Sequence, residues 1–303
     1  MVKKSMAVSL VAVATSSLLV LGACGNTDTS SSDKKNEDTK TTETTKDTSK
    51  DTSKDTSKDT AKDTATKDEK ALLDWSYSGS TGPTHWGSIK PEYKISDTGK
   101  KQSPINIETK DAKADKAKVS IGYKYQPTMF KVTRKDKMVQ VVAQPAKGRA
   151  DSKITVAKKE YTLKEINIHT PSEHQLDGKD YAAELQLKHV SADNKVAIIS
   201  VFVKEGDKNQ AVGDLTSVVA SSENGKTVAM KQAISTLGLI TADSKIYAYD
   251  GSLTTPATTE GVSWFVYEKP ITMSKQQLSD LTKQLDDNNR PEQKLNDRPI
   301  SSN

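Results

Sequence analysis

The sequence predicts a mainly β domain with a few short helices over residues 71–303. Short segments of alternating or β-rich residues recur through this stretch, whereas helical periodicity is confined to two places. The stretch is long enough to bury a core of its own, which it needs because Cys24 is the only cysteine and no disulfide can form within the chain. The whole chain is 33% hydrophobic and 5% aromatic, so we expect another part of it to be unfolded.

Residues 1–23 have the features of a secretory signal peptide. Two lysines precede an apolar run over residues 6–21, and the run ends in Gly22 and Ala23. The run is short for a membrane span and ends at small residues rather than charges, which argues against a transmembrane anchor.

The sequence Leu-Gly-Ala-Cys at residues 21–24 resembles the lipobox of bacterial lipoproteins. This resemblance implies cleavage before Cys24 and attachment of a diacylglyceryl group to its thiol. We therefore expect a lipid anchor in the bacterial cell membrane, with the protein on the extracytoplasmic face.

Residues 24–70 contain scarcely an apolar side chain, and a Lys-Asp-Thr-Ser repeat runs over residues 46–63. With nothing to bury, this segment is predicted to be a disordered tether between the acylated Cys24 and the folded domain. A flexible chain of about 45 residues has a root-mean-square reach of roughly 35 to 40 Å.

The positive charge of the chain belongs to the predicted domain. Residues 1–70 hold 12 basic and 12 acidic residues, which leaves 33 basic and 28 acidic residues in 71–303 and places the whole net charge of +5 there. Such a mild excess is compatible with anionic polymers, but it is not the pattern of a nucleic-acid-binding protein.

Strands and helices are predicted from periodicity. The second helical stretch begins after Ser274, where Gln277 has capping-box spacing ahead of Leu278, Leu281 and Leu285. The first helical stretch is Thr227–Leu237, and the clearest strand candidates are Lys118–Tyr123, Met138–Ala143, Ala183–Val190 and Ala197–Val203.

Two neighbouring motifs carry the chemistry. Residues 166–174 read Ile-Asn-Ile-His-Thr-Pro-Ser-Glu-His, and residues 181–189 read Tyr-Ala-Ala-Glu-Leu-Gln-Leu-Lys-His. Further matches stand at residues 75–79, 82–86, 102–107, 252–256 and 289–291, and at Trp264, Gln293 and Arg298. In this order and spacing, from about Trp75 to Pro299, the chain resembles the α-carbonic anhydrases.

This resemblance implies a large, twisted, mostly antiparallel sheet with a conical cavity, in which three histidines hold zinc. Two of the histidines form a His-x-His pair, and side chains two apart on a strand point to the same face and reach one ion. In the family, the zinc activates water for attack on carbon dioxide.

Two of the three ligand positions have changed in this chain. The His-x-His pair is replaced by Asn167 and His169, and the third position is Gln186. A neutral amide is a poor zinc ligand beside imidazole or thiolate, so we expect no zinc and no other cofactor. The remaining histidines match structural positions of the family, and His189 points to the opposite strand face from Gln186.

The resemblance assigns several other positions. Glu173 and Thr254 match the pair that orients the zinc-bound hydroxide, and Glu184 matches the carboxylate that supports the third histidine. Lys137 stands at the proton-shuttle position, where a lysine is a poor shuttle at neutral pH. Lys188 places a charge in the substrate pocket, whose remaining lining would be Ile198, Val201, Leu253, Val262 and Trp264.

The sequence therefore predicts a catalytically silent cell-surface lipoprotein that acts as a binding module. The expected partners are the membrane, through the lipid on Cys24, and an anionic glycan or cell-wall polymer, supported by lysine pairs such as Lys100-Lys101 and Lys158-Lys159. The alternatives are an active carbonate dehydratase with an atypical metal site, a hydrolase using residual groups, and a folded spacer or protein-interaction domain.

Overall fold

The computed structural model describes residues 73–144 and 148–303. The predicted signal peptide, Cys24 and the tether lie outside these residues. No helix in the described ranges has both the length and the apolar character needed to cross a membrane.

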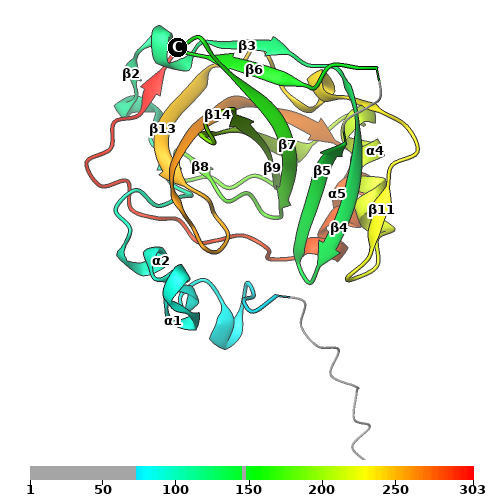
Figure 1. Ribbon diagram of the computed structural model, residues 1–303, viewed down its shortest axis with the longest axis horizontal. Coiled ribbons are helices and arrows are strands. Elements are labelled where there is room, and N and C mark those ends of the chain that lie inside the picture. The colour runs from blue at the N-terminus through cyan, green and yellow to red at the C-terminus, as the bar shows by residue number, and fades with distance from the viewer. Residues whose placement is uncertain (1–72, 145–147) are drawn as a thin grey trace, which may run out of the picture. The chain divides into compact units, whose positions relative to one another are not determined.

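One large sheet dominates the described part of the chain (Figure 1). Its long strands follow each other in space as β4, β5, β7, β9, β10, β14 and β13. Neighbours are antiparallel, except that β10 and β14 are parallel. These strands are β4 (Pro127–Lys135), β5 (Met138–Gln144), β7 (Lys159–His169), β9 (Ala183–Ser191), β10 (Val196–Glu205), β13 (Ile246–Ser252) and β14 (Glu260–Met273).

Shorter strands complete the sheet and its edges. β11 and β12 pair with β4, β15 pairs with β13 and β2, and β6 joins β3 to the first half of β7, while β1 and β8 pair separately. Their bounds are β1 (Asn106–Ile107), β2 (Lys113–Ala114), β3 (Ile121–Lys124), β6 (Lys153–Val156), β8 (Gln175–Leu176), β11 (Thr227–Ala229), β12 (Ile234–Ser235) and β15 (Ser301–Ser302).

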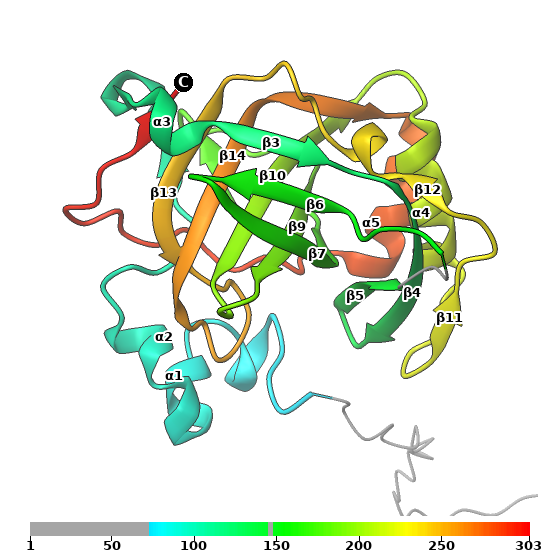
Figure 2. The same ribbon diagram turned by 45° about the horizontal axis from the view of Figure 1, so that its top comes forward.

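The helices are short and lie outside the sheet. Figures 1 and 2 show α4 and α5 side by side near β4 and β5, whereas α3 lies beside β3 and the C-terminus. Their bounds are α1 (Trp86–Ile89), α2 (Ile95–Thr98), α3 (Lys116–Val119), α4 (Gln210–Ala220) and α5 (Lys275–Leu285), with 3-10 turns at Gly79–Thr81, Pro91–Tyr93, Thr109–Asp111 and Thr236–Leu239.

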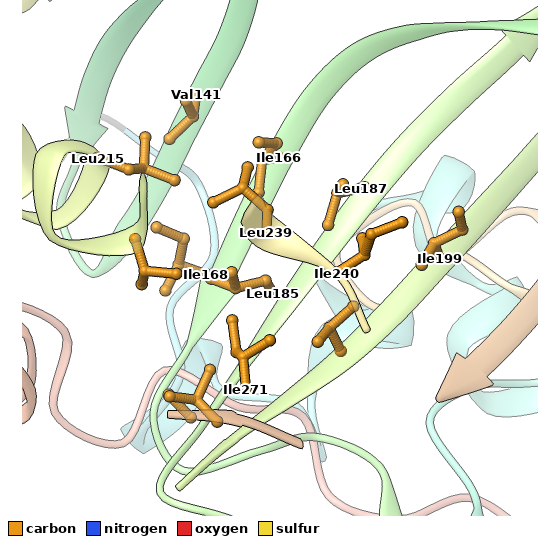
Figure 3. Close-up of a cluster of buried hydrophobic side chains, with 14 of the residues drawn as sticks. Val141, Ile166, Ile168, Leu185, Leu187, Ile199, Leu215, Leu239, Ile240 and Ile271 are labelled. Atoms are coloured by element: carbon orange, nitrogen blue, oxygen red, sulfur yellow. The ribbon is translucent and has the colours of Figure 1, made fainter. Parts of the chain in front are cut away.

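Alternation along the strands separates the two faces of the sheet. Ile166 and Ile168 of β7 and Leu185 and Leu187 of β9 project into the main hydrophobic core, which also receives Leu215 of α4 (Figure 3). The residues between them therefore face the other way, because successive side chains on a strand point to opposite faces. That second face carries a smaller apolar cluster and the candidate site.

The structure confirms the mainly β, mostly antiparallel architecture and most of the predicted elements. The predicted strands at 138–143, 183–190 and 197–203 are β5, β9 and β10. The predicted helix after Ser274 is α5, with both hydrogen bonds of the capping box to Gln277.

Two predicted elements are wrong in whole or in part. Thr227–Leu237 is not a helix but contains β11, β12 and the start of a 3-10 turn, because Val228 and Ile234 lie in strands that pair with β4. Lys118–Tyr123 is a strand only from Ile121, because Asp115 caps α3 by accepting a hydrogen bond from the backbone of Lys118.

Candidate functional site

Three consecutive cross-strand pairs form a ladder on the second face of β7 and β9. Glu165 lies opposite Lys188, Asn167 opposite Gln186, and His169 opposite Glu184. We call these six residues the polar ladder. Each pair is two residues from the next, so all six side chains share one face, as the sequence predicted for Asn167, His169 and Gln186.

His169 is held at the buried end of the ladder. Its Nδ1 lies 2.7 Å from the carbonyl oxygen of Asn288. A carbonyl oxygen only accepts, so Nδ1 carries the hydrogen. Nε2 lies 3.4 Å from Oε2 of Glu173 and has no hydrogen-bond partner in the described structure. His169 is only 2% exposed, so this nitrogen faces into the site rather than into solvent.

Gln186 connects the carboxylates of the site. Its Nε2 donates to Oε2 of Glu173 at 2.7 Å and to Oε1 of Glu184 at 3.1 Å. Its Oε1 accepts a long hydrogen bond, 3.5 Å, from the hydroxyl of Thr254. An amide rotated by 180° would place its oxygen against two carboxylates, so electrostatics fixes its orientation.

Glu173 and Thr254 both contact the amide of Gln186 but are not hydrogen-bonded to each other in the described structure. Gln186 bridges them, with its nitrogen on Glu173 and its oxygen toward Thr254. The second oxygen of Glu173 accepts from the backbone N–H of Arg290 at 2.9 Å. The buried hydroxyl of Tyr77 has no partner in the described structure, and burial together with the charge of Glu173 raises its pKa well above the ordinary value.

Glu184 is fully buried and makes five hydrogen bonds. It accepts from the backbone N–H groups of Glu173 and His174, from Nδ1 of His174, from the hydroxyl of Ser200 and from Gln186. Burial alone would raise the pKa of Glu184, but the charge and hydrogen bonds of His174 outweigh it and lower that pKa to about 2. The carboxylate therefore stays ionised over the physiological range.

The outer end of the ladder is an ion pair. Nζ of Lys188 lies 2.9 Å from Oε1 of Glu165, and Gln140 donates to the other carboxylate oxygen at 3.0 Å. The two charged side chains are 22% and 15% exposed. Lys188 does place a charge on this face, but Glu165 neutralises it.

Most of the predicted apolar lining lies on the same face as the ladder. Ile198 and Val262 belong to the second apolar cluster, Trp264 packs 4.7 Å from the ring of His174, and Leu253 is half-buried against the cluster. Val201 was predicted to join them, and this is wrong. It lies opposite Leu185 in the main core, because its odd spacing from Ile198 turns it to the other face.

The other two predicted positions, Lys137 and His189, do not belong to the ladder. Lys137 is exposed in the turn between β4 and β5, and its carbonyl accepts from the side chain of Asn288. His189 faces the main core, where Nε2 lies 2.9 Å from the hydroxyl of Tyr125, so it points away from Gln186 as expected. Its role as a replacement ligand is thereby excluded by geometry.

Comparison with known proteins identifies the family that has this arrangement. The sequence profile described as eukaryotic-type carbonic anhydrase matches residues 81–303. The chain belongs to the eukaryotic-type carbonic anhydrase family. A carbonic anhydrase of Nostoc sp. is 31% identical over 230 residues, 75% of this chain and 85% of that protein, and one of Neisseria gonorrhoeae is 33% identical over 228 residues, 75% of this chain and 86% of that protein.

A solved structure confirms the fold of the family. The α-carbonic anhydrase of Thermovibrio ammonificans, in complex with the inhibitor sulfanilamide, superimposes with a TM-score of 0.70 at 34% identity, over 75% of this chain and 98% of that chain. The large sheet and its few short helices are therefore those of an α-carbonic anhydrase.

The donor set of the site does not fit the zinc that this family normally uses. His169 supplies one imidazole nitrogen, Asn167 and Gln186 supply only amide oxygens, and the amide nitrogen of Gln186 is committed to the two carboxylates. Among the described residues, no three His, Cys, Asp or Glu side chains are grouped as metal ligands.

Sequence reasoning missed several residues that hold the site together. Asn288 orients His169, Arg290 binds Glu173 through its backbone, and Glu165 neutralises Lys188. Glu165 could have been predicted from strand alternation, because it stands two residues before Asn167 and must share its face of β7. Asn288 and Arg290 come from a loop 120 positions away in sequence, as the separation of Asn288 from Ile168 shows, and only the fold brings them there.

Proposed function

We propose that this domain holds no zinc at the family's metal position, does not hydrate carbon dioxide, and serves at the bacterial cell surface as a binding module. The observation that carries the proposal is the amide of Gln186, which stands at a ligand position and donates to both Glu173 and Glu184. These hydrogen bonds satisfy two buried carboxylates without a metal ion.

The surviving residues support a structural role for the former metal centre. Glu173, Glu184 and His169 are each at most 3% exposed and are hydrogen-bonded within the protein. A buried charge is tolerated only when it is paired and hydrogen-bonded, and the two carboxylates meet that condition. No nucleophile and base stand together among them, which argues against a hydrolase.

The localisation forms a second part of the proposal. The lipobox-like sequence before Cys24 and the polar tether over residues 24–70 support a lipid-anchored protein on the extracytoplasmic face of the cell membrane. The net charge of +5, all of it in residues 71–303, supports an anionic glycan or cell-wall polymer as the partner.

Restoring the missing ligands tests the catalytic part. The wild-type chain and the variant Asn167→His with Gln186→His are purified, supplied with zinc, dialysed, and compared for bound zinc and carbon dioxide hydration. We expect the double variant to bind about one zinc per chain, because three imidazoles on two adjacent strands then reach one ion. The wild type is expected to retain none and to show no hydration above background.

Two further variants serve as controls. Asn167→His and Gln186→His alone each supply two imidazoles, and we expect neither to retain stoichiometric zinc. Circular dichroism in the near ultraviolet checks that all variants remain folded. Stoichiometric zinc and clear hydration by the wild type would instead identify an active carbonate dehydratase with an atypical metal site.

A further inference from the structure

Two cavities flank the short helix α3. The first, which we call the Tyr161 cavity, has a volume of about 230 Å³ and is lined by the apolar residues Val156 and Phe265, by Tyr161, and by Lys118 and Asp250. It lies between the turn that joins β6 to β7 and the strands β13 and β14. An apolar surface with a few polar groups at its edge is typical of a ligand site.

The second cavity lies on the other side of α3 and β3. This Tyr123 cavity has a volume of about 580 Å³, and its lining includes Val119, Ile121 and Tyr123 together with Lys116 and Lys245. Lys116 and Lys118, from the same helix, thus line different cavities. Figures 1 and 2 show α3, β3 and β6 along one side of the domain, next to the C-terminus.

Three lysines that line these cavities, and Lys158 in the turn beside the Tyr161 cavity, form no salt bridge with an acidic side chain. Lys116, Lys118, Lys158 and Lys245 form no ion pair in the described structure, and all but Lys118 are exposed. Lys159, next to Lys158, differs because it is bound to Asp193 at 2.7 Å. An excess of uncompensated positive charge remains around α3.

The acidic groups at the cavities cancel only part of this charge. Asp243, which lines the Tyr123 cavity, is bound to Lys269 at 2.7 Å. Asp250, which lines the Tyr161 cavity, forms no ion pair in the described residues. Its carboxylate is therefore free to accept hydrogen bonds from hydroxyl groups.

The turn at the edge of the Tyr161 cavity is strained. Ala157 and Lys158 form the two-residue connection between β6 and β7 and have φ values of +46° and +66°. Side chains other than Gly, Asn and Asp are disfavoured in this left-handed region. Strained backbone of this kind is concentrated at functional sites.

The polar ladder is a poorer place for an anion. Lys188 is neutralised by Glu165, and two ionised or hydrogen-bonded carboxylates lie behind it. Lys100 and Lys101 line another cavity, of about 290 Å³, which shares Asp250 with the Tyr161 cavity but adds a second carboxylate, that of Asp297. The guanidinium of Arg298 beside it is committed to backbone carbonyls.

We infer that an anionic glycan binds along α3, with neighbouring sugar units in the Tyr161 and Tyr123 cavities. The apolar faces of the sugar rings pack on the tyrosines and aliphatic side chains, the acidic groups meet Lys116, Lys118 and Lys158, and hydroxyl groups meet Asp250. This inference rests on the binding part of the proposed function, and it is independent of whether the domain holds zinc.

Binding of the full chain to defined polymers tests the inference. Biolayer interferometry is carried out with immobilised polygalacturonate as a carboxylate-bearing glycan, phosphomannan as a phosphate-bearing glycan, and dextran as a neutral one. We expect at least one anionic polymer to bind, with an affinity that falls about tenfold between roughly 50 and 300 mM salt. Comparison of the two anionic polymers identifies the acidic group, and binding to neither overturns the inference.

Charge-matched variants locate the site. We expect Lys116→Gln, Lys118→Gln and Lys158→Gln together to weaken binding about tenfold or more, because three charge-assisted contacts are lost. The control Lys100→Gln, Lys101→Gln and Lys204→Gln removes the same charge from other exposed positions and should change the affinity less than about twofold. Equal losses in both triple variants, or equally tight binding of dextran, would overturn the inference.

A third variant tests the packing of the sugar ring. Tyr161→Leu leaves the net charge unchanged. We expect it to lower the affinity for the polymer that binds, while the salt dependence of that affinity stays the same. The zinc and activity measurements on the same wild-type preparation separate the two proposals. If the wild type is inactive and binds no polymer, the present inference is wrong and the proposed lack of activity stands. If it is active and binds polymer at α3, the proposed lack of activity is wrong and the present inference stands.

Discussion

His189 shows how a single buried residue contributes to the acid sensitivity of the domain. It is fully buried, and its ring stacks on Tyr125 with the planes at 4°. Burial lowers the pKa of His189 to about 3, although the nearby backbone of Leu187 and Ala197 acts in the opposite direction. The folded protein therefore keeps this imidazole neutral at pH values where an unfolded chain would protonate it.

The resulting prediction concerns the window between about pH 6.5 and pH 3. In this window the unfolded state binds one more proton at His189 than the folded state, so the free energy of unfolding decreases as the pH falls. At pH 5 the loss from this residue amounts to about 2 kcal/mol relative to neutral pH. Urea unfolding at pH 7 and pH 5 should show that His189→Gln removes most of this loss.

His85 provides the control, because it is exposed on the surface. His85→Gln should leave the pH dependence of the unfolding free energy unchanged. An unaltered pH dependence in His189→Gln would show that the acid sensitivity of the domain arises elsewhere.

At the scale of residues, strand alternation was the most reliable guide to the site. It placed Asn167, His169 and Gln186 together, and it placed His189 on the other face. The same rule, applied to β10, would have excluded Val201 from the pocket, since Val201 is three residues from Ile198. The contact between Gln186 and Glu173 was not predictable, because Glu173 lies in a loop whose path depends on the rest of the fold.

Among the elements, the β6–β7 hairpin has a turn whose residues do not suit its backbone. Ala157 and Lys158 occupy left-handed positions for which Asn and Gly are the preferred residues in a two-residue hairpin. The variant Ala157→Asn with Lys158→Gly should therefore raise the free energy of unfolding by about 1 kcal/mol, measured by urea denaturation at neutral pH. The gain comes from relief of backbone strain.

Lys158→Ala separates strain from charge in this experiment. It removes the same positive charge but leaves a residue with a Cβ atom in the left-handed conformation. We expect no stabilisation from it, and a gain equal to that of the double variant would assign the effect to charge.

Elements were predictable where a local signal agreed with the tertiary environment. The capping box at Ser274 and Gln277 marked α5 correctly, because the leucines that follow are buried against the core. α4 was missed although Asn209 caps it and Val212, Leu215 and Val219 repeat at helical spacing. Residues 227–237 have a similar pattern, but pairing with β4 outweighs their weak helical preference.

At the scale of the whole molecule, the lipobox-like sequence before Cys24 leads to a prediction about where the protein resides in the cell. If lipid on Cys24 is the only link to the membrane, Cys24→Ser should move the protein from the membrane fraction to the soluble or secreted fraction, because serine offers no thiol for lipid attachment. Immunoblotting of fractionated cells measures the distribution.

Thr27→Ser, close to the same site, should leave the protein in the membrane fraction. A Cys24→Ser protein that also remains there would show that the association does not depend on lipid attached to this residue.

The pairing of Asn167 with Gln186 across two strands has a consequence for the history of this domain. A single codon change at either position supplies only two imidazoles, and at Gln186 it also removes the donor shared by two buried carboxylates. Selection for hydration of carbon dioxide would thus gain nothing from the first step. If the chain is inactive, as we propose, a route to zinc binding and hydration needs both substitutions together and has no favourable intermediate.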